Sequence, residues 1–111
     1  MPVPVLVETD QLLRQRVGSS AARSFLTSIA AGDLSVSHLT PGLLRAAVAF
    51  DLRHADLDLG LVDGAVMAVA EREQLPILTF DFRDFRAAPR LDGSPWQLLL
   101  DEAAFRRLTA R

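Results

Sequence analysis

The chain has 111 residues, half of them hydrophobic and under a quarter charged, which is the composition of one folded domain rather than of a disordered segment. Its formal net charge of −2 excludes binding of nucleic acid through bulk positive charge, so any contact with nucleic acid must be local. The sequence shows no cysteine, no signal peptide and no apolar run of membrane-spanning length. This excludes a disulfide framework and thiolate zinc sites, and it favours a cytoplasmic protein.

Helices are expected to dominate the first half of the chain, with one short strand among them. Apolar residues recur at the helical period over residues 5–16, and a second helix follows with Ser19 or Ser20 as its cap. Residues 34–39 alternate between apolar and polar, which predicts a short strand. Thr40 and Pro41 then form a strong helix start, and this third helix is expected to run to about His54.

The second half begins with an acidic turn at residues 56–60 and continues with the most hydrophobic helix, over residues 61–74. Because its first three turns are apolar on nearly all sides, this helix is expected to be buried. Residues 77–80 and 96–100 are interpreted as buried strands, and the tail 101–111 as a short helix. Helices that alternate with short buried strands predict one α/β domain over residues 1–111, with a mostly parallel sheet.

Three carboxylates occupy positions that are unusual for surface acids. Asp63 falls in the buried half of its helix, Asp81 follows a buried strand directly, and Glu8 lies at the edge of an apolar helix face. Each also has an ordinary interpretation. Asp63 would be a first-turn acid favoured by the helix dipole, Asp81 a turn residue, and Glu8 a solvated residue near a helix boundary. Ligand sites of parallel sheets lie beyond the carboxyl ends of the strands, where one helix–strand unit would bring Asp63 and Asp81 together.

A cluster of two or three carboxylates needs a cation or a shared proton to relieve the repulsion between its charges. Carboxylates without histidine or cysteine are the ligand set that suits Mg²⁺ or Mn²⁺. Such ions activate water and neutralise the charge of a phosphodiester during hydrolysis. The three acids therefore indicate nuclease or phosphatase chemistry.

Three segments, in order along the chain, resemble PIN-domain proteins, most closely the VapC-type toxins of bacterial toxin–antitoxin pairs. Residues 59–73 around Asp63 and residues 77–85 around Asp81 resemble the second half of that family. Residues 4–14 resemble the family's helix that carries a glutamate, here Glu8. The resemblance extends over about residues 4–100 and implies a Rossmann-like α/β/α sandwich.

The resemblance assigns roles to five residues. Glu8, Asp63 and Asp81 match the second, third and fourth acids of a cluster that binds Mg²⁺ or Mn²⁺ and cleaves RNA. Thr79 matches a hydroxyl position that often supports this site. Asp84 matches an acid frequently present after the fourth, which either supports the site from outside or belongs to a turn.

The resemblance also implies partners. RNA would be the substrate, an antitoxin would cover the acidic site with its tail, and the toxin would form a homodimer. Arginines around the cleft, such as Arg14 or Arg83, would hold the phosphates of the RNA backbone.

The family's first acid has no match in this chain, which begins where the family's second strand ends. A unit of about 30–40 residues, the size of a strand–helix–strand unit, has no counterpart, so the sandwich is expected to be N-terminally incomplete. Two hypotheses stay open: a nuclease toxin whose first strand lies upstream, or a catalytically inactive PIN-like module that binds an antitoxin or dimerises with an active relative. A third interpretation is a small α/β domain whose acids form no site.

Overall fold

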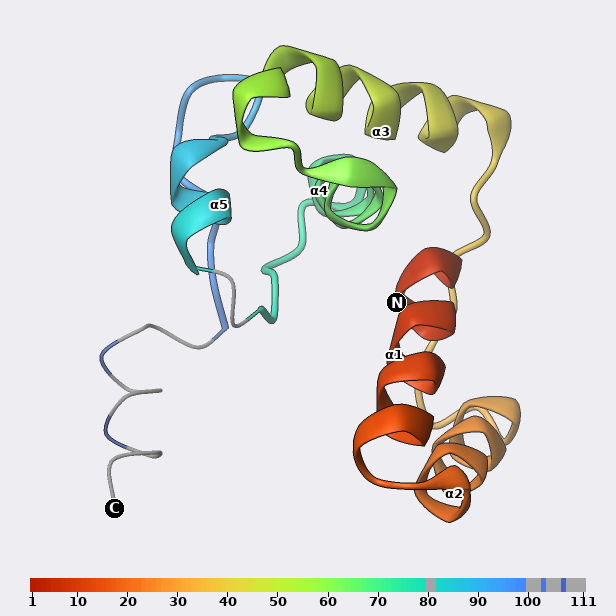
Figure 1. Cartoon of the computed structure of the whole chain (residues 1–111). Helices are drawn as coiled ribbons and strands as arrows, with labels where there is room; N and C mark the ends of the chain where they lie inside the picture. The colour runs from red at the N-terminus through yellow and green to blue at the C-terminus, as the bar shows by residue number, and fades with distance from the viewer. Residues whose placement is uncertain (80–81, 100–102, 104–106, 108–111) are drawn as a thin grey trace.

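The computed structural model describes residues 1–79, 82–99, 103 and 107 of the chain (Figure 1). It shows a hairpin of two helices and a body in which two further helices pack against each other. The hairpin consists of α1 (Val3–Arg16) and α2 (Ser19–Ala30). The body consists of α3 (Pro41–Arg53), the 3-10 helix η1 (Ala55–Leu57), α4 (Gly60–Glu73) and α5 (Phe82–Ala87).

Local signals in the sequence account for most helix boundaries. The predicted start of α3 is confirmed, because the Thr40 hydroxyl accepts a hydrogen bond from the Leu43 N–H at 3.2 Å and proline occupies the first turn. The serine cap predicted for α2 is wrong: Gly18 takes the cap position and Ser19 is already helical. The six-residue α5 was not expected, since so short a helix shows no apolar period. The helix expected over 101–111 falls outside the described residues, apart from Ala103 and Arg107.

The predicted sheet is not formed in the part of the chain that the structure describes. The expected strands are reduced to two isolated parallel bridges, Pro2–Ser37 and Ile77–Leu98. Their direction is as expected, but each is a two-stranded pair, and such pairs are marginal in water without a third strand. At the Pro2–Ser37 bridge, the strand pairing also cannot continue toward α1. Pro2 has no N–H, and its carbonyl opens α1 by accepting a hydrogen bond from the Val5 N–H at 3.0 Å.

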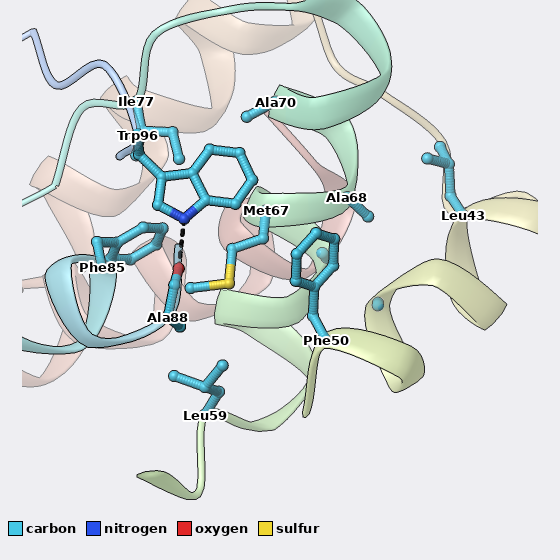
Figure 2. Packing of buried hydrophobic residues seen from close by; sticks show 12 residues of the cluster. Leu43, Phe50, Leu59, Met67, Ala68, Ala70, Ile77, Phe85, Ala88 and Trp96 are labelled. Carbon is cyan, nitrogen blue, oxygen red and sulfur yellow. Dashed lines mark hydrogen bonds between the residues drawn. The ribbon is translucent and has the colours of Figure 1, made fainter. Parts of the chain in front are cut away.

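The hydrophobic core lies among α3, α4, α5 and the segment around Trp96 (Figure 2). Met67 of α4 is fully buried, with Phe50 and Phe85 on either side of it. The rings of Phe50 and Trp96 lie 5.8 Å apart at a tilt of 52°, and the Trp96 Nε1–H donates to the Ala88 carbonyl oxygen at 2.6 Å. The expected burial of the most hydrophobic helix is therefore confirmed, and α4 is the central element of the body.

Helices α3 and α4 pack closely against each other at Gly64. A Cβ atom at Gly64 would lie 2.5 Å from the carbonyl oxygen of Ala47 on α3, and 3.2 Å from its carbonyl carbon. No side chain fits at that distance unless the backbones move apart. Glycine at position 64 therefore allows the close spacing of α3 and α4. This contact lies one residue after Asp63, near the start of α4.

The hairpin lies outside this core. Among the described residues, every member of the core cluster falls between Leu39 and Leu98, and α1 contains no buried residue. The hairpin still reaches the body, since α1 contacts α4. The line of contact between these two helices is where the site predicted from the sequence would lie.

Candidate functional site

Glu8 lies on the exposed side of α1, in the wall of a groove between α1 and α4. The groove has a volume of about 640 Å³. Its walls are mostly apolar and include Leu12 from α1, and Leu61 and Val62 from the first turn of α4. Helical spacing places Glu8 one turn before Leu12, as the sequence predicted. Among the lining residues that the structure describes, Glu8 is the charged one.

Asp63 follows Val62 directly and is half-buried in the first turn of α4. The dipole of α4 favours a carboxylate at this position, because the unpaired N–H groups of the first turn carry partial positive charge. The structure therefore brings the first turn of α4, which carries Asp63, to the groove that Glu8 borders. Glu8 and Asp63 are 55 positions apart in the sequence and come from the two parts of the molecule.

The remaining predicted residues are Thr79, Asp81 and Asp84, which are close together in the sequence. Asp81 falls outside the described residues. Thr79 is half-buried and follows the bridge residue Ile77 by two positions. Asp84 is half-buried in the first turn of α5. The structure thus gives the positions of Thr79 and Asp84 on either side of Asp81 in the chain.

The donor set fits a hard divalent cation. Glu8 and Asp63 offer carboxylate oxygens, and the chain has no cysteine that would draw a softer metal. Within residues 1–79, 82–99, 103 and 107, no three acidic or histidine side chains gather closely enough to hold a metal. Asp81 lies outside those ranges, so the cluster of Glu8, Asp63 and Asp81 stays a prediction.

The two arginines named as phosphate contacts differ in their surroundings. The Arg14 Nε–H lies 3.0 and 3.1 Å from the two carboxylate oxygens of Asp10, one helical turn earlier on α1. Arg83 is exposed on α5, two residues after Asp81. Arg14 is thus held in an ion pair on the helix that carries Glu8, whereas Arg83 lies on α5.

One polar contact at this end of α4 has no signal in the sequence. Asp51 of α3 accepts a hydrogen bond from the Gly60 N–H through Oδ1, at 2.9 Å. The two residues are nine positions apart and belong to different helices. A pattern of neighbouring residues cannot reveal such a contact, because it depends on how α3 packs against α4.

Comparison with known proteins identifies the family. No curated protein matches the chain. In the part that the structure describes, no helix combines the length and the apolar character needed to cross a membrane. A scan against protein families matches the PIN domain over residues 1–91, a range that contains all five residues predicted for the site. PIN domains are nucleases, often toxins, which generally use divalent metal ions and act on RNA. The chain belongs to the PIN-domain family.

Proposed function

We propose that the protein is a metal-dependent endoribonuclease that acts as a cytoplasmic toxin, forms a homodimer and is neutralised by a cognate antitoxin. In this proposal Glu8, Asp63 and Asp81 hold one or more Mg²⁺ or Mn²⁺ ions. The observation that carries the proposal is the groove, which Glu8 of α1 lines together with Leu61 and Val62, the two residues before Asp63 in the first turn of α4. Membership in a family of nucleases supports the nuclease part of the proposal.

The residues of the proposed site would divide the chemistry among them. A bound divalent cation supplies an activated water and offsets the negative charge of the phosphodiester. The carboxylates of Glu8, Asp63 and Asp81 would hold it. Thr79 and Asp84 keep the segment that carries Asp81 in place. Arg83 contacts a phosphate of the bound RNA.

The test is cleavage of a structured RNA and a single-stranded RNA by the purified chain, with EDTA, Mg²⁺ or Mn²⁺. We expect EDTA to abolish cleavage and one of the ions to restore it. Asp63→Asn and Asp81→Asn should each lower the rate about 100-fold or more, since the loss of groups that merely support metal ligands already costs 10–100-fold. Glu73→Gln is the matched control, because it removes one charge at the opposite end of α4. Cleavage that persists in EDTA and in both aspartate variants would contradict the proposal.

A second candidate function is that of an inactive PIN-like module that binds an antitoxin or pairs with an active relative. Three residues of this sequence, Glu8, Asp63 and Asp81, match three of the four acids that the resemblance implies. If this function is correct, the chain should still bind the antitoxin or the relative when Asp63→Ala and Asp81→Ala are combined. Analytical ultracentrifugation of the double variant with the partner would show the complex. An absence of cleavage in the unchanged chain, together with an intact complex, would favour this function over the nuclease.

A further inference from the structure

The start of α4 is an abrupt turn. Asp58 has a φ of 51° and Gly60 a φ of 78°, so two left-handed residues flank Leu59 just as the helix begins. Leu59 is buried in the core, which fixes the turn on one side. A side chain at residue 60 would be strained at this φ, so the turn depends on glycine there.

The first turn of α4 receives its cap from another helix. The residue at its cap position, Leu59, offers no side-chain hydrogen bond within the described residues. A helix leaves its first N–H groups unsatisfied, and a carboxylate or hydroxyl oxygen normally accepts one of them. Here the acceptor is Asp51 of α3, whose Oδ1 lies 2.9 Å from the Gly60 nitrogen in a half-buried position. The carboxylate therefore ties the start of α4 to α3.

We infer that Asp51 is a positioning residue for Asp63, and this inference rests on the proposed function. Asp63 lies three residues after Gly60, so it belongs to the turn whose first N–H group Asp51 holds. The direction of the Asp63 side chain follows the backbone of that turn. Leu61 and Val62 of the same turn form the groove wall across from Glu8. If the turn shifts, the distance between the carboxylates of Asp63 and Glu8 shifts with it.

Asp51 could act on Asp63 through its hydrogen bond to Gly60 or through its negative charge, and two substitutions of Asp51 separate these effects. Asp51→Ala removes both the acceptor and the negative charge. Asp51→Asn removes the charge but keeps an Oδ1 acceptor for the Gly60 N–H. Asp56→Ala, in η1, is the matched control, because it removes an exposed carboxylate from the segment that leads into the same turn.

The experiment measures three properties of the full chain. The exchange rate of the Gly60 amide, measured by NMR, should rise about fivefold in Asp51→Ala, the factor that corresponds to loss of a typical helix cap. The affinity for Mn²⁺, measured from the EPR signal of the free ion, should fall about 10–100-fold, as for other groups that orient metal ligands. RNA cleavage at limiting Mn²⁺ should fall with the affinity and recover at saturating Mn²⁺. Asp51→Asn and Asp56→Ala should differ from the unchanged chain by no more than about threefold in all three properties. A difference of that size is smaller than the effect expected from loss of a helix cap or of a group that orients a metal ligand.

The outcomes distinguish this inference from the proposed function. If Asp51→Asn loses as much Mn²⁺ affinity as Asp51→Ala, the effect is one of charge and the positioning role is refuted. The role is also refuted if Asp51→Ala leaves Gly60 exchange or Mn²⁺ affinity unchanged while Asp63→Ala abolishes binding. If the unchanged chain neither binds Mn²⁺ nor cleaves RNA, the proposed function fails, and the role of Asp51 at that site fails with it. Thermal unfolding monitored by circular dichroism verifies that each variant is folded.

Discussion

Replacement of Gly64 by alanine tests the close contact between α3 and α4 at this residue. The new Cβ atom would lie 2.5 Å from the Ala47 carbonyl oxygen, whereas ordinary contacts begin at 3.4 Å, a shortfall of 3.4 − 2.5 = 0.9 Å. The next nearest atoms, at 3.2 and 3.4 Å, also belong to the Ala47 backbone, so no flexible side chain can move aside. The helices must separate instead, which loosens the packing around the fully buried Met67.

The magnitude follows from two opposing effects. Overpacking of a core costs about 1–3 kcal/mol, while exchange of glycine for alanine inside a helix returns up to about 1 kcal/mol of helix propensity. We expect Gly64→Ala to lower the free energy of unfolding by up to about 2 kcal/mol, the overpacking cost less the gain in helix propensity. For a domain of this size, each kcal/mol corresponds to a decrease in Tm of about 4–8 °C.

Urea denaturation followed by the fluorescence of Trp96, which packs in the core against Phe50, measures the change in the body directly. Gly42→Ala is the matched control, because a Cβ atom there meets no atom nearer than the Thr40 hydroxyl oxygen at 4.0 Å. This control should be as stable as the unchanged chain or slightly more stable, since alanine is the better helix former. If Gly64→Ala proves as stable as Gly42→Ala, the close approach of α3 and α4 at this point is refuted.

Two further predictions concern the segment that follows α5. Trp96→Phe removes the Nε1–H that donates to the Ala88 carbonyl at 2.6 Å, and a buried acceptor left without its donor should cost about 1–3 kcal/mol in urea unfolding. A loss well under 1 kcal/mol would mean that this bond is not formed in solution. Hydrogen bonds from the Ser94 hydroxyl and the Ser94 N–H lower the pKa of Asp92 from its ordinary 3.8. The bonds therefore stabilise the fold above pH 3.8, and this contribution disappears as the pH falls through the lowered pKa of the folded state. An NMR titration should place the Asp92 midpoint below 3.8, and Ser94→Ala should raise it; an unchanged midpoint in the variant would contradict the assignment.

The helices were predictable because their signals are local. Thr40 and Pro41 stand next to the turn that they cap, and the apolar period of α4 is complete within the helix itself. The N-cap of α2 shows the limit of local signals. Ser19 and Ser20 are both good capping residues, but Gly18 occupies the cap position. The order of Glu8, Asp63 and Asp81 along the chain, with the segments around them, indicated a family, and the match over residues 1–91 supports it.

Features that depend on distant parts of the chain were not predictable in the same way. Residues 34–39 and 77–80 have the pattern of strands, but a strand needs neighbours, and the described residues supply one bridge to each. The contact between Gly64 and Ala47 and the cap that Asp51 gives to Gly60 both arise from the packing of α3 on α4. The sequence around Gly64 and Asp51 gives no sign that the first lies at a helix–helix contact and the second caps another helix.

The separation of the hairpin from the core has a consequence for partial unfolding. Local opening is easiest where few apolar side chains are buried, and α1 buries none of its own residues completely. The hairpin should therefore detach at lower denaturant concentration than α3 and α4, which share the core around Met67. Glu8 belongs to the first of these units and Asp63 to the second. The groove therefore exists only while the hairpin is packed against the body. Mild denaturant would separate the α1 wall from the α4 wall while the body remained folded.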